Sequence, residues 1–388
     1  MMTKLRKFAP RNLIVQGIKR ARQAQWVWHQ ARAVAVESNR SPYQILREQM
    51  LLSIFHSIGS HDYFQYRLFK PNLSWDEKTR YLPSDAKATA LRSLLTPDKY
   101  RCLYYNKLIF HRFFSSQGFP LATLYGVYDT VVGHVTDGRH LRNTTDLQDW
   151  IRNSGVDEFV FKPLEGSLGA MILVFAGRAN DEPDTFVTLA GEKYDAAQLV
   201  AFAKRRAFLL EERIRPHPEL AELIGPTLCC VRMQTIITLD GTPKIIAAVF
   251  KIQPKPIGVD HLIYGGVGAW VDLNTGVLGR GRTRFDRADT VVIPDSDVRF
   301  EGVRLPDWAA AKGLALRAAA AFPWARAIGW DIALSERGPV LIEGNDRWFT
   351  TLIQIPAPHG LMTGELQALY QALRGGNGRP RRSFLGKY

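Results

Sequence analysis

The 388-residue chain contains only three cysteines, two of which are adjacent in the sequence. Cys102, Cys229 and Cys230 form neither the disulfide framework of a small secreted protein nor a zinc-binding pattern. The chain also lacks a run of about 18 uncharged apolar residues, the length that a bilayer-spanning helix needs. Its basic N-terminus has no uninterrupted apolar segment like that of a signal peptide. We therefore expect a cytoplasmic protein in a reducing compartment.

Net charge is almost absent from the middle of the chain. Residues 1–40 carry nine Lys and Arg against one Glu, a net of +8, and residues 374–388 carry five basic residues and no acid, so only +1 of the total +14 remains between them. A nucleic-acid-binding core would need a basic face, so we expect no nucleic-acid partner. The basic ends are either ordinary solvated segments or contacts to an anionic surface. On the second interpretation, residues 1–40 touch the inner face of a membrane peripherally.

Composition and hydrophobic periodicity divide the chain into four regions. Helices are expected at 13–36, 43–58, 99–117, 145–153, 195–205, 308–322 and 364–373, while residues 60–98 are polar and irregular. Short strands dominate much of the rest, notably a hairpin around Asp240-Gly241. The four predicted regions are a basic helical region 1–97, a region 98–206 with a glycine-loop hairpin, a larger region 207–373 with a metal-binding hairpin, and a disordered basic tail 374–388.

Residues 329–345 are the most informative segment, because two strand-like runs with few polar residues flank a short turn. If residues 336–338 form a three-residue loop closed by a left-handed glycine, Asp331 lies opposite Glu343. Asn345, two residues on, returns to the same face. Two carboxylates and an amide oxygen together suit Mg²⁺, which completes its shell with phosphates and water. This arrangement indicates a Mg-nucleotide site; the alternative is an ordinary hairpin with solvated acids.

Lys162 ends a strand-like run and precedes a loop that contains Glu165, Gly166, Ser167 and Gly169. Glycines allow backbone N–H groups to approach phosphate oxygens, and a nearby ammonium group adds positive charge. The spacing is neither that of a P-loop nor that of a dinucleotide-binding fingerprint. Because glycine-rich hairpin tips are common, this pattern alone also fits a loop without a ligand.

Several further charged residues are candidates for the same site. Arg232 interrupts an apolar strand and needs an anionic partner, either a structural carboxylate or a transferring phosphate. Lys251 is a weaker candidate of the same kind. Glu211 and Glu212 end another apolar strand, where they either contact adenine and ribose or simply mark a charged strand end. Lys107 is a single helical lysine, for which solvation is the ordinary expectation.

The order of these parts resembles the ATP-grasp superfamily, and more narrowly the branch called sugar-transfer-associated ATP-grasp proteins, over residues 98–356. The resemblance implies an α+β fold in which two α+β subdomains with antiparallel sheets hold ATP between them, after a helical N-terminal region. It depends on the segments 161–169, 211–214, 231–232, 265–266, 271–272, 329–331 and 342–345 and on Gln354.

The resemblance also implies roles for individual residues. Arg232, Lys162 and Lys251 would act on the transferred phosphoryl group, and the loop would close over it. The phosphates would be held by Lys107, Lys162, Glu165, Gly166, Ser167 and Gly169, the adenine and ribose by Glu211, Glu212 and Ile214, and two Mg²⁺ ions by Asp331, Glu343 and Asn345, with Glu343 bridging the two.

The implied reaction is ATP-dependent ligation of a carboxylate to an amine through an acyl phosphate. The family name suggests a cell-surface glycan or its precursor as substrate, and thus polysaccharide biosynthesis. Alternatives are a phosphotransferase acting on a hydroxyl group and a non-catalytic nucleotide-binding protein of glycan assembly. Two segments depart from the family pattern: residues 346–349 are bulkier than expected, and residues 260–266 follow it only loosely. The departures concern the acceptor substrate.

Overall fold

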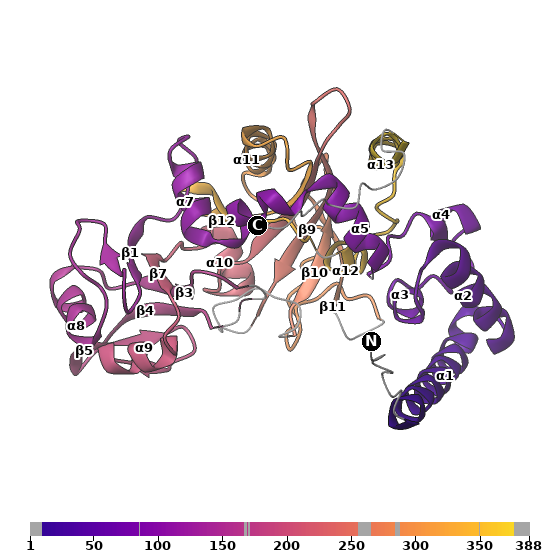
Figure 1. Cartoon of the computed structure of the whole chain (residues 1–388), viewed down its shortest axis with the longest axis horizontal. Coiled ribbons are helices and arrows are strands. Elements are labelled where there is room, and N and C mark those ends of the chain that lie inside the picture. Colours follow the sequence, from indigo (N-terminus) through magenta and orange to yellow (C-terminus); the bar gives the residue numbers. More distant parts are fainter. Residues whose placement is uncertain are drawn as a thin grey trace, which may run out of the picture. The chain divides into compact units, whose positions relative to one another are not determined.

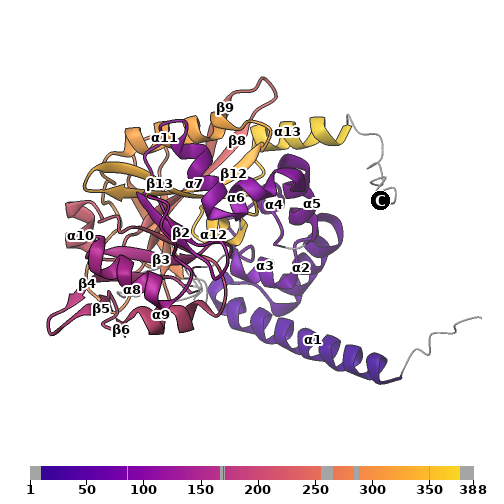
Figure 2. The same ribbon diagram turned by 60° about the vertical axis from the view of Figure 1, so that its left-hand side comes forward.

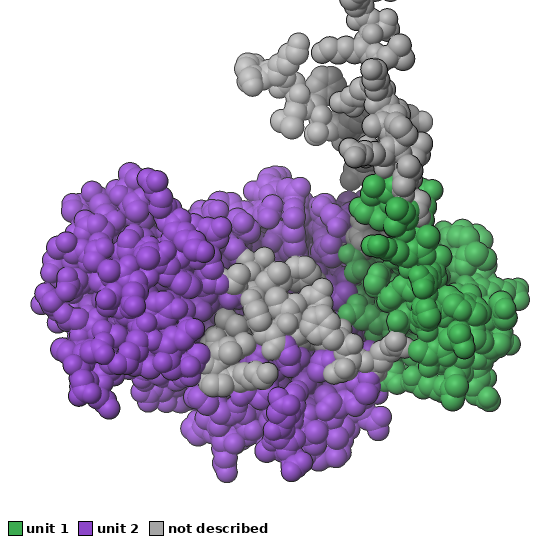
Figure 3. All heavy atoms as spheres, turned by 90° about the horizontal axis from the view of Figure 1, so that it is seen from below, with its two compact units in different colours: residues 1–87 green, residues 88–388 purple. Residues whose placement is uncertain are grey.

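The computed structural model describes residues 10–84, 86–166, 169, 171–254, 265–283, 288–348 and 350–375. These residues form two compact units, residues 1–87 and residues 88–388 (Figure 3). The predicted tail beyond residue 375, Ser167 and most of the segment 260–266 lie outside the described residues. Within the described part of the chain, no helix is both long enough and apolar enough to cross a membrane.

The first unit consists of helices. Ser41 caps the N-terminus of α2, because its side chain accepts a hydrogen bond from the Gln44 N–H and the Gln44 side chain accepts one from the Ser41 N–H. The segment 60–98, expected to be irregular, contains three short helices and buried aromatic residues, so that expectation was wrong. The helices of this unit are α1 (Pro10–Ser38), α2 (Pro42–His56), α3 (Ser60–Gln65) and α4 (Trp75–Thr79).

A half-buried carboxylate, that of Glu48, joins the helices of the first unit. Glu48 on α2 accepts hydrogen bonds from Arg40 (3.1 Å), Tyr63 (2.8 Å) and Lys78 (2.9 Å). Burial raises the pKa of Glu48, but its bonds to Arg40 and Lys78 outweigh burial and hold the pKa below its ordinary value. The first unit therefore has its own polar centre.

The second unit begins with a series of helices and contains a seven-stranded sheet in the order β2-β1-β7-β3-β4-β5-β6. Helices α8 and α9 pack on this sheet and share a core with it, rich in Phe and Leu (Figures 1 and 2). Its elements are α5 (Ala86–Leu95), the 3₁₀ turn η1 (Asp98–Tyr100), α6 (Arg101–Tyr105), α7 (Lys107–Ser115), β1 (Leu124–Tyr128), β2 (His134–Val135), α8 (Thr144–Asn153), β3 (Phe159–Pro163), β4 (Leu173–Ala179), β5 (Glu182–Thr188), β6 (Lys193–Tyr194), α9 (Ala196–Ala203) and β7 (Phe208–Glu212).

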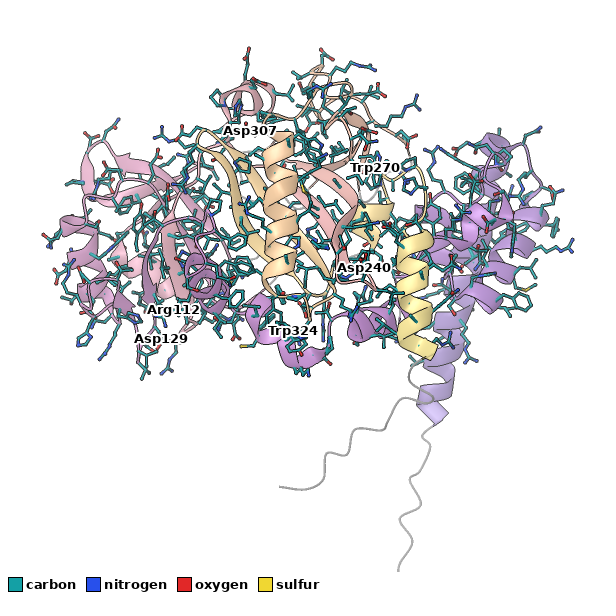
Figure 4. All side chains as sticks on the ribbon, turned by 90° about the horizontal axis from the view of Figure 1, so that it is seen from above. Arg112, Asp129, Asp240, Trp270, Asp307 and Trp324 are labelled. Atoms are coloured by element: carbon teal, nitrogen blue, oxygen red, sulfur yellow. The ribbon has the colours of Figure 1, made fainter. Side chains whose placement is uncertain are left out.

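The second sheet has six strands in the order β11-β10-β9-β8-β12-β13, with each neighbouring pair antiparallel. Helix α11 lies across one face of it, between the labelled Asp307 and Trp324 (Figure 4), and buries a row of alanines against the sheet. The elements are α10 (Pro218–Ile224), β8 (Cys230–Ile237), β9 (Pro243–Ile252), β10 (Val267–Val271), β11 (Leu278–Thr283), α11 (Trp308–Ala321), β12 (Ala327–Ser335), β13 (Gly338–Asn345), α12 (Thr350–Gln354) and α13 (Gly364–Gly375).

One predicted helix is divided in the structure. The sequence predicts a single helix over 99–117, but the chain breaks at Asn106, whose backbone is extended with φ −94° and ψ 111°. The Asn106 side chain accepts a hydrogen bond from the Ile109 N–H (3.1 Å) and so caps a new helix. The break makes Lys107 the first residue of α7, beside the glycine loop.

Candidate functional site

The β12–β13 hairpin places Asp331 opposite Glu343, as the sequence predicts, although the turn differs from the prediction. Ser335 pairs with Gly338, so the loop has two residues instead of three. The register is restored by a bulge, because Ile332 pairs with Leu341 and leaves one extra residue on β13 before Glu343. The extra residue is Ile342, which lies between the Asp331–Glu343 pair and the turn.

Asp331 is buried between two cations. It lies opposite Arg232 on the neighbouring strand β8, and Arg232 donates two hydrogen bonds to it, from Nε (2.6 Å) and Nη2 (2.9 Å). Lys251 on β9 donates a third (3.2 Å). Burial raises the pKa of Asp331, but the charges of Arg232 and Lys251 more than offset burial and hold the pKa far below its ordinary value. Of the two partners considered for Arg232, the structure therefore shows the carboxylate.

Glu343 and Asn345 are half-buried at the end of β13. Asn345 Nδ2 donates to Glu343 Oε1 (3.1 Å) and to the Gly329 carbonyl (3.3 Å), which fixes the amide beside the carboxylate. Among the described residues, no three His, Cys, Asp or Glu side chains are grouped as a metal site. The oxygen donors at this end of the hairpin are the carboxylates of Asp331 and Glu343 and the amide of Asn345.

Lys162 and Glu211 form a buried ion pair in the seven-stranded sheet. They come from the adjacent antiparallel strands β3 and β7. Glu212 points elsewhere: its carboxylate accepts from the Thr123 N–H (2.9 Å) and pairs with Arg337 (2.9 Å). Glu211 is thus buried beside Lys162, whereas Glu212 is not. The sequence does not reveal this difference, because the two glutamates are adjacent in it.

Lys107 joins the glycine loop to the rest of the site. Its ammonium donates to the Gly166 carbonyl (3.2 Å), and its backbone N–H bonds the Leu164 carbonyl (3.0 Å). The preceding residue, Asn106, donates to Glu165 (3.3 Å). Burial lowers the pKa of Lys107, and the negative charge of Glu343 opposes that effect. Lys107 therefore lies between the glycine loop and the β12–β13 hairpin, instead of lying free on a helix surface.

A single cavity collects most of the predicted site residues. Its lining combines charged and apolar side chains, and among the latter Ile214 packs in a small cluster with Cys230 and Val340. Apolar lining residues, including Val160 on β3, Ile172 just before β4 and Leu352 on α12, were missed by the sequence prediction because they resemble ordinary core positions. The predicted residues that line the cavity are Lys107, Lys162, Gly169, Glu211, Glu212, Ile214, Arg232, Lys251, Asp331, Glu343 and Asn345.

Two predicted loop residues do not line this cavity. Glu165 instead bonds Asn106, and Gly166 lines an adjoining cavity. Gly166 and Gly169 have positive φ values, 143° and 69°, so the glycines are required by the backbone whether or not a phosphate binds. Ser167 lies outside the described residues.

Residues 87–370 match the family model described as sugar-transfer associated ATP-grasp, which covers most of the chain. The chain belongs to this family. Its two antiparallel sheets and their helices form the α+β ATP-grasp fold, after an N-terminal helical region. A search of the curated proteins gave no match.

Solved structures resemble this ATP-grasp chain only at low identity. Biotin carboxylase from Campylobacter jejuni is 12% identical, with a TM-score of 0.38, over 72% of this chain and 47% of its own. L-amino acid ligase from Bacillus licheniformis is 11% identical, with a TM-score of 0.42, over 73% and 55%. The chain spans about half the length of the first structures that it matches. The family match, not these similarities, assigns the fold.

Proposed function

We propose that this ATP-grasp protein is an ATP- and Mg²⁺-dependent ligase that joins a carboxylate to an amine. The observation that carries the proposal is one cavity lined by five basic side chains, four carboxylates and an amide together with apolar side chains such as Val160, Ile214 and Leu352. A nucleotide needs both kinds of side chain, because its base is flat and largely apolar and its phosphates are anionic. The basic residues are Lys107, Lys162, Arg213, Arg232 and Lys251.

The residues present fit both ATP and magnesium. Glu343 and Asn345 offer oxygen atoms to this cavity, and Asp331 lies opposite Glu343 on the same hairpin. These hard oxygen donors would hold Mg²⁺, and we propose two ions. When bound, the metal would neutralise charge on the transferred phosphoryl group.

In the proposed reaction, an acceptor carboxylate oxygen attacks the γ-phosphorus of ATP. The bond from that phosphorus to the bridging oxygen breaks, and ADP leaves with the electron pair. An amine nitrogen then attacks the acyl carbon, loses a proton and releases phosphate, which forms the amide. Arg232 and Lys251 would stabilise charge on the transferred group, and Lys162 and Lys107 would orient the phosphates.

The name of the family supports a glycan, or a precursor of one, as the source of the carboxylate or the amine. The basic N-terminal segment supports the same assignment, since it would suit an acidic glycan or a lipid-linked acceptor. This substrate class is part of the proposal.

The first test is thermal unfolding with Mg²⁺ alone and with Mg²⁺ plus a non-hydrolysable ATP analogue. At about 100 times its dissociation constant the analogue should add roughly 2.7 kcal/mol to the free energy of unfolding, and so raise the midpoint by several degrees. Glu343→Gln should reduce this shift. The control Glu182→Gln, which removes only an exposed pair with Lys193, should leave it unchanged. No shift in the wild type would refute the nucleotide site.

The second test is ADP release with paired carboxylate and amine substrates. A ligase makes product only when both are present, so amide formation with stoichiometric ADP supports the proposal. ADP release with a hydroxyl acceptor and without any amine would instead indicate a phosphotransferase. Nucleotide binding without turnover across the glycan-derived acceptors would indicate an accessory protein.

The basic face of α1 is proposed to contact an anionic membrane surface. Lys19, Arg20 and Arg22 are all exposed on this helix. Each basic residue near an anionic surface contributes about 1 kcal/mol to binding. Changing all three to Glu should therefore abolish sedimentation with vesicles that contain phosphatidylserine, without changing the unfolding midpoint. Equal sedimentation of variant and wild type would refute the contact.

A further inference from the structure

A second cavity of about 330 Å³ adjoins the nucleotide cavity within the unit 88–388. Lys107, Glu343 and Asn345 line both cavities, so the two meet at the proposed metal site. The volume lies at the lower end of the range for small-molecule sites. An acceptor bound here would face ATP across the residues proposed to hold Mg²⁺.

Arg101, in the short helix α6, lines this second cavity with an incompletely satisfied guanidinium group. Its Nε is buried and makes no hydrogen bond to a described residue, and its contact with Asp346 is long at 3.8 Å. The guanidinium lies over the Tyr105 ring, 4.7 Å from the ring centroid, which restricts its orientation. A planar, fixed guanidinium is suited to bidentate binding of a carboxylate.

Tyr104 provides a second, independent sign of a missing partner. Its side chain is only 6% exposed, and its hydroxyl is buried without a hydrogen bond to any described residue. The ring packs edge-on against Trp330, at 6.0 Å between centroids. Gly344 leaves the room for this packing, because a Cβ there would lie 2.8 Å from Tyr104 Cδ1. A buried hydroxyl left unpaired costs free energy, and a ligand oxygen would offset that cost.

We propose that the second cavity is the acceptor site and that Arg101 and Tyr104 bind the carboxylate of a small hydroxy acid or sugar acid. The assignment rests on the proposed function, since it names the acid that the ligase would activate. Polar residues that could bind the hydroxyl groups of such an acid come from α5, namely Thr89 and Ser93.

Charge favours an acid over a neutral polyol. The second cavity is lined by Arg92, Arg101, Lys107 and Arg347 against Asp98, Glu343 and Asp346. Four basic residues thus face three acidic ones, and Glu343 would be occupied by the metal in the working enzyme. A neutral sugar would leave the guanidinium of Arg101 with only its long ionic contact to Asp346 among the described residues.

The experiment measures ligand binding by saturation-transfer NMR on the full chain, with acids paired to neutral partners of similar size. The pairs are glycolate with ethylene glycol, lactate with 1,2-propanediol, gluconate with sorbitol, and glucuronate with glucose. Binding is measured with and without Mg²⁺ and the ATP analogue, so that loss of nucleotide binding and loss of acid binding are seen separately. At least one acid should bind about tenfold more tightly than its neutral partner, as expected for charge-assisted hydrogen bonds.

Two variants test the residues. Arg101→Gln should abolish the preference for acids while leaving the analogue-induced shift in midpoint intact. Tyr104→Phe should weaken acid binding about threefold to tenfold without lowering the unfolding midpoint, because it deletes an unpaired buried hydroxyl. Arg139→Gln is the matched control, because Arg139 is exposed and pairs only with nearby Asp137 among the described residues. Equal binding of acids and neutral partners, no binding of any acid, or an unchanged preference in Arg101→Gln would overturn the assignment.

Discussion

Asp331→Asn tests whether the buried carboxylate of Asp331 neutralises the charges of Arg232 and Lys251; these three residues form the buried charge cluster. In the native protein this carboxylate receives two hydrogen bonds from Arg232 and one from Lys251, and all three side chains are at most 5% exposed. The variant keeps the size of the side chain but removes its charge. Two buried cations would then face each other without a counter-ion, and the new amide N–H₂ would compete with their donors.

The expected loss is about 3 to 5 kcal/mol in the free energy of unfolding, the usual cost of breaking a buried ion pair by removing one partner. For a unit of this size, that corresponds to a fall in the unfolding midpoint of roughly 6 to 10 °C. The double variant Arg232→Gln/Asp331→Asn removes a cation as well. It should be at least about 1.5 kcal/mol more stable than the sum of the two single losses predicts, because contacting charges are not additive.

The measurement is urea unfolding at neutral pH, followed by Trp fluorescence, because Trp330 is the neighbour of Asp331 in β12. Asp137→Asn is the control: it breaks an exposed pair with Arg139 (2.7 Å) and should cost less than about 1 kcal/mol. If Asp331→Asn lost no more than this control, the cluster would not be a balanced buried ion pair and the reasoning would be refuted.

Three other outcomes follow from the same contacts. The pKa of Asp331 is lowered in the folded state, so its contribution to stability is complete above the unfolded pKa of about 3.9 and is lost as the pH falls toward the folded pKa. When the pH is lowered below about 4, the free energy of unfolding measured in urea should therefore fall less for Asp331→Asn than for the wild type. Gly344→Ala should cost about 1 to 3 kcal/mol, since its Cβ would lie 2.9 Å from the buried Trp330 ring, whereas Gly313→Ala in α11 meets nothing within 4 Å and should be neutral or stabilising in the same thermal assay. Lys107→Met should leave the unfolding midpoint unchanged or raised, because burial disfavours the ammonium, yet it should halve or abolish the shift that the ATP analogue produces; a full shift would exclude Lys107 from the phosphate site.

The pairing within the β12–β13 hairpin was predictable because strand pairing has a fixed geometry. Alternation places Asp331, Glu343 and Asn345 on one face in any register that pairs the first two. The location of the irregularity was not predictable, because a three-residue loop and a two-residue loop followed by a bulge give the same final pairing. The sequence therefore predicted the pairing of Asp331 with Glu343 correctly, but it placed the extra residue in the turn instead of on β13.

The partners of the buried charges were not predictable from the sequence. Arg232 lies 99 residues before Asp331, and only the order of strands in the sheet makes β8 and β12 neighbours. The same limit applies to Lys107. The sequence around Lys107 reads as one continuous helix and does not indicate the break at Asn106. An Asn within such a pattern can either continue the helix or cap a new one. Here a contact distant in the sequence accompanies the break, the hydrogen bond from the Lys107 N–H to the Leu164 carbonyl.

The pairing of charges explains how the cavity can be both stable and receptive to a polyanion. Lys162 is neutralised by Glu211, and Arg232 and Lys251 share Asp331, so the buried cations are held by hydrogen bonds in fixed positions. A ligand with several negative charges would meet cations that these carboxylates already hold in place. The acids thus set the positions of the cations for the proposed phosphates, and Glu343, paired with no described cation, is left as the carboxylate most available to a metal.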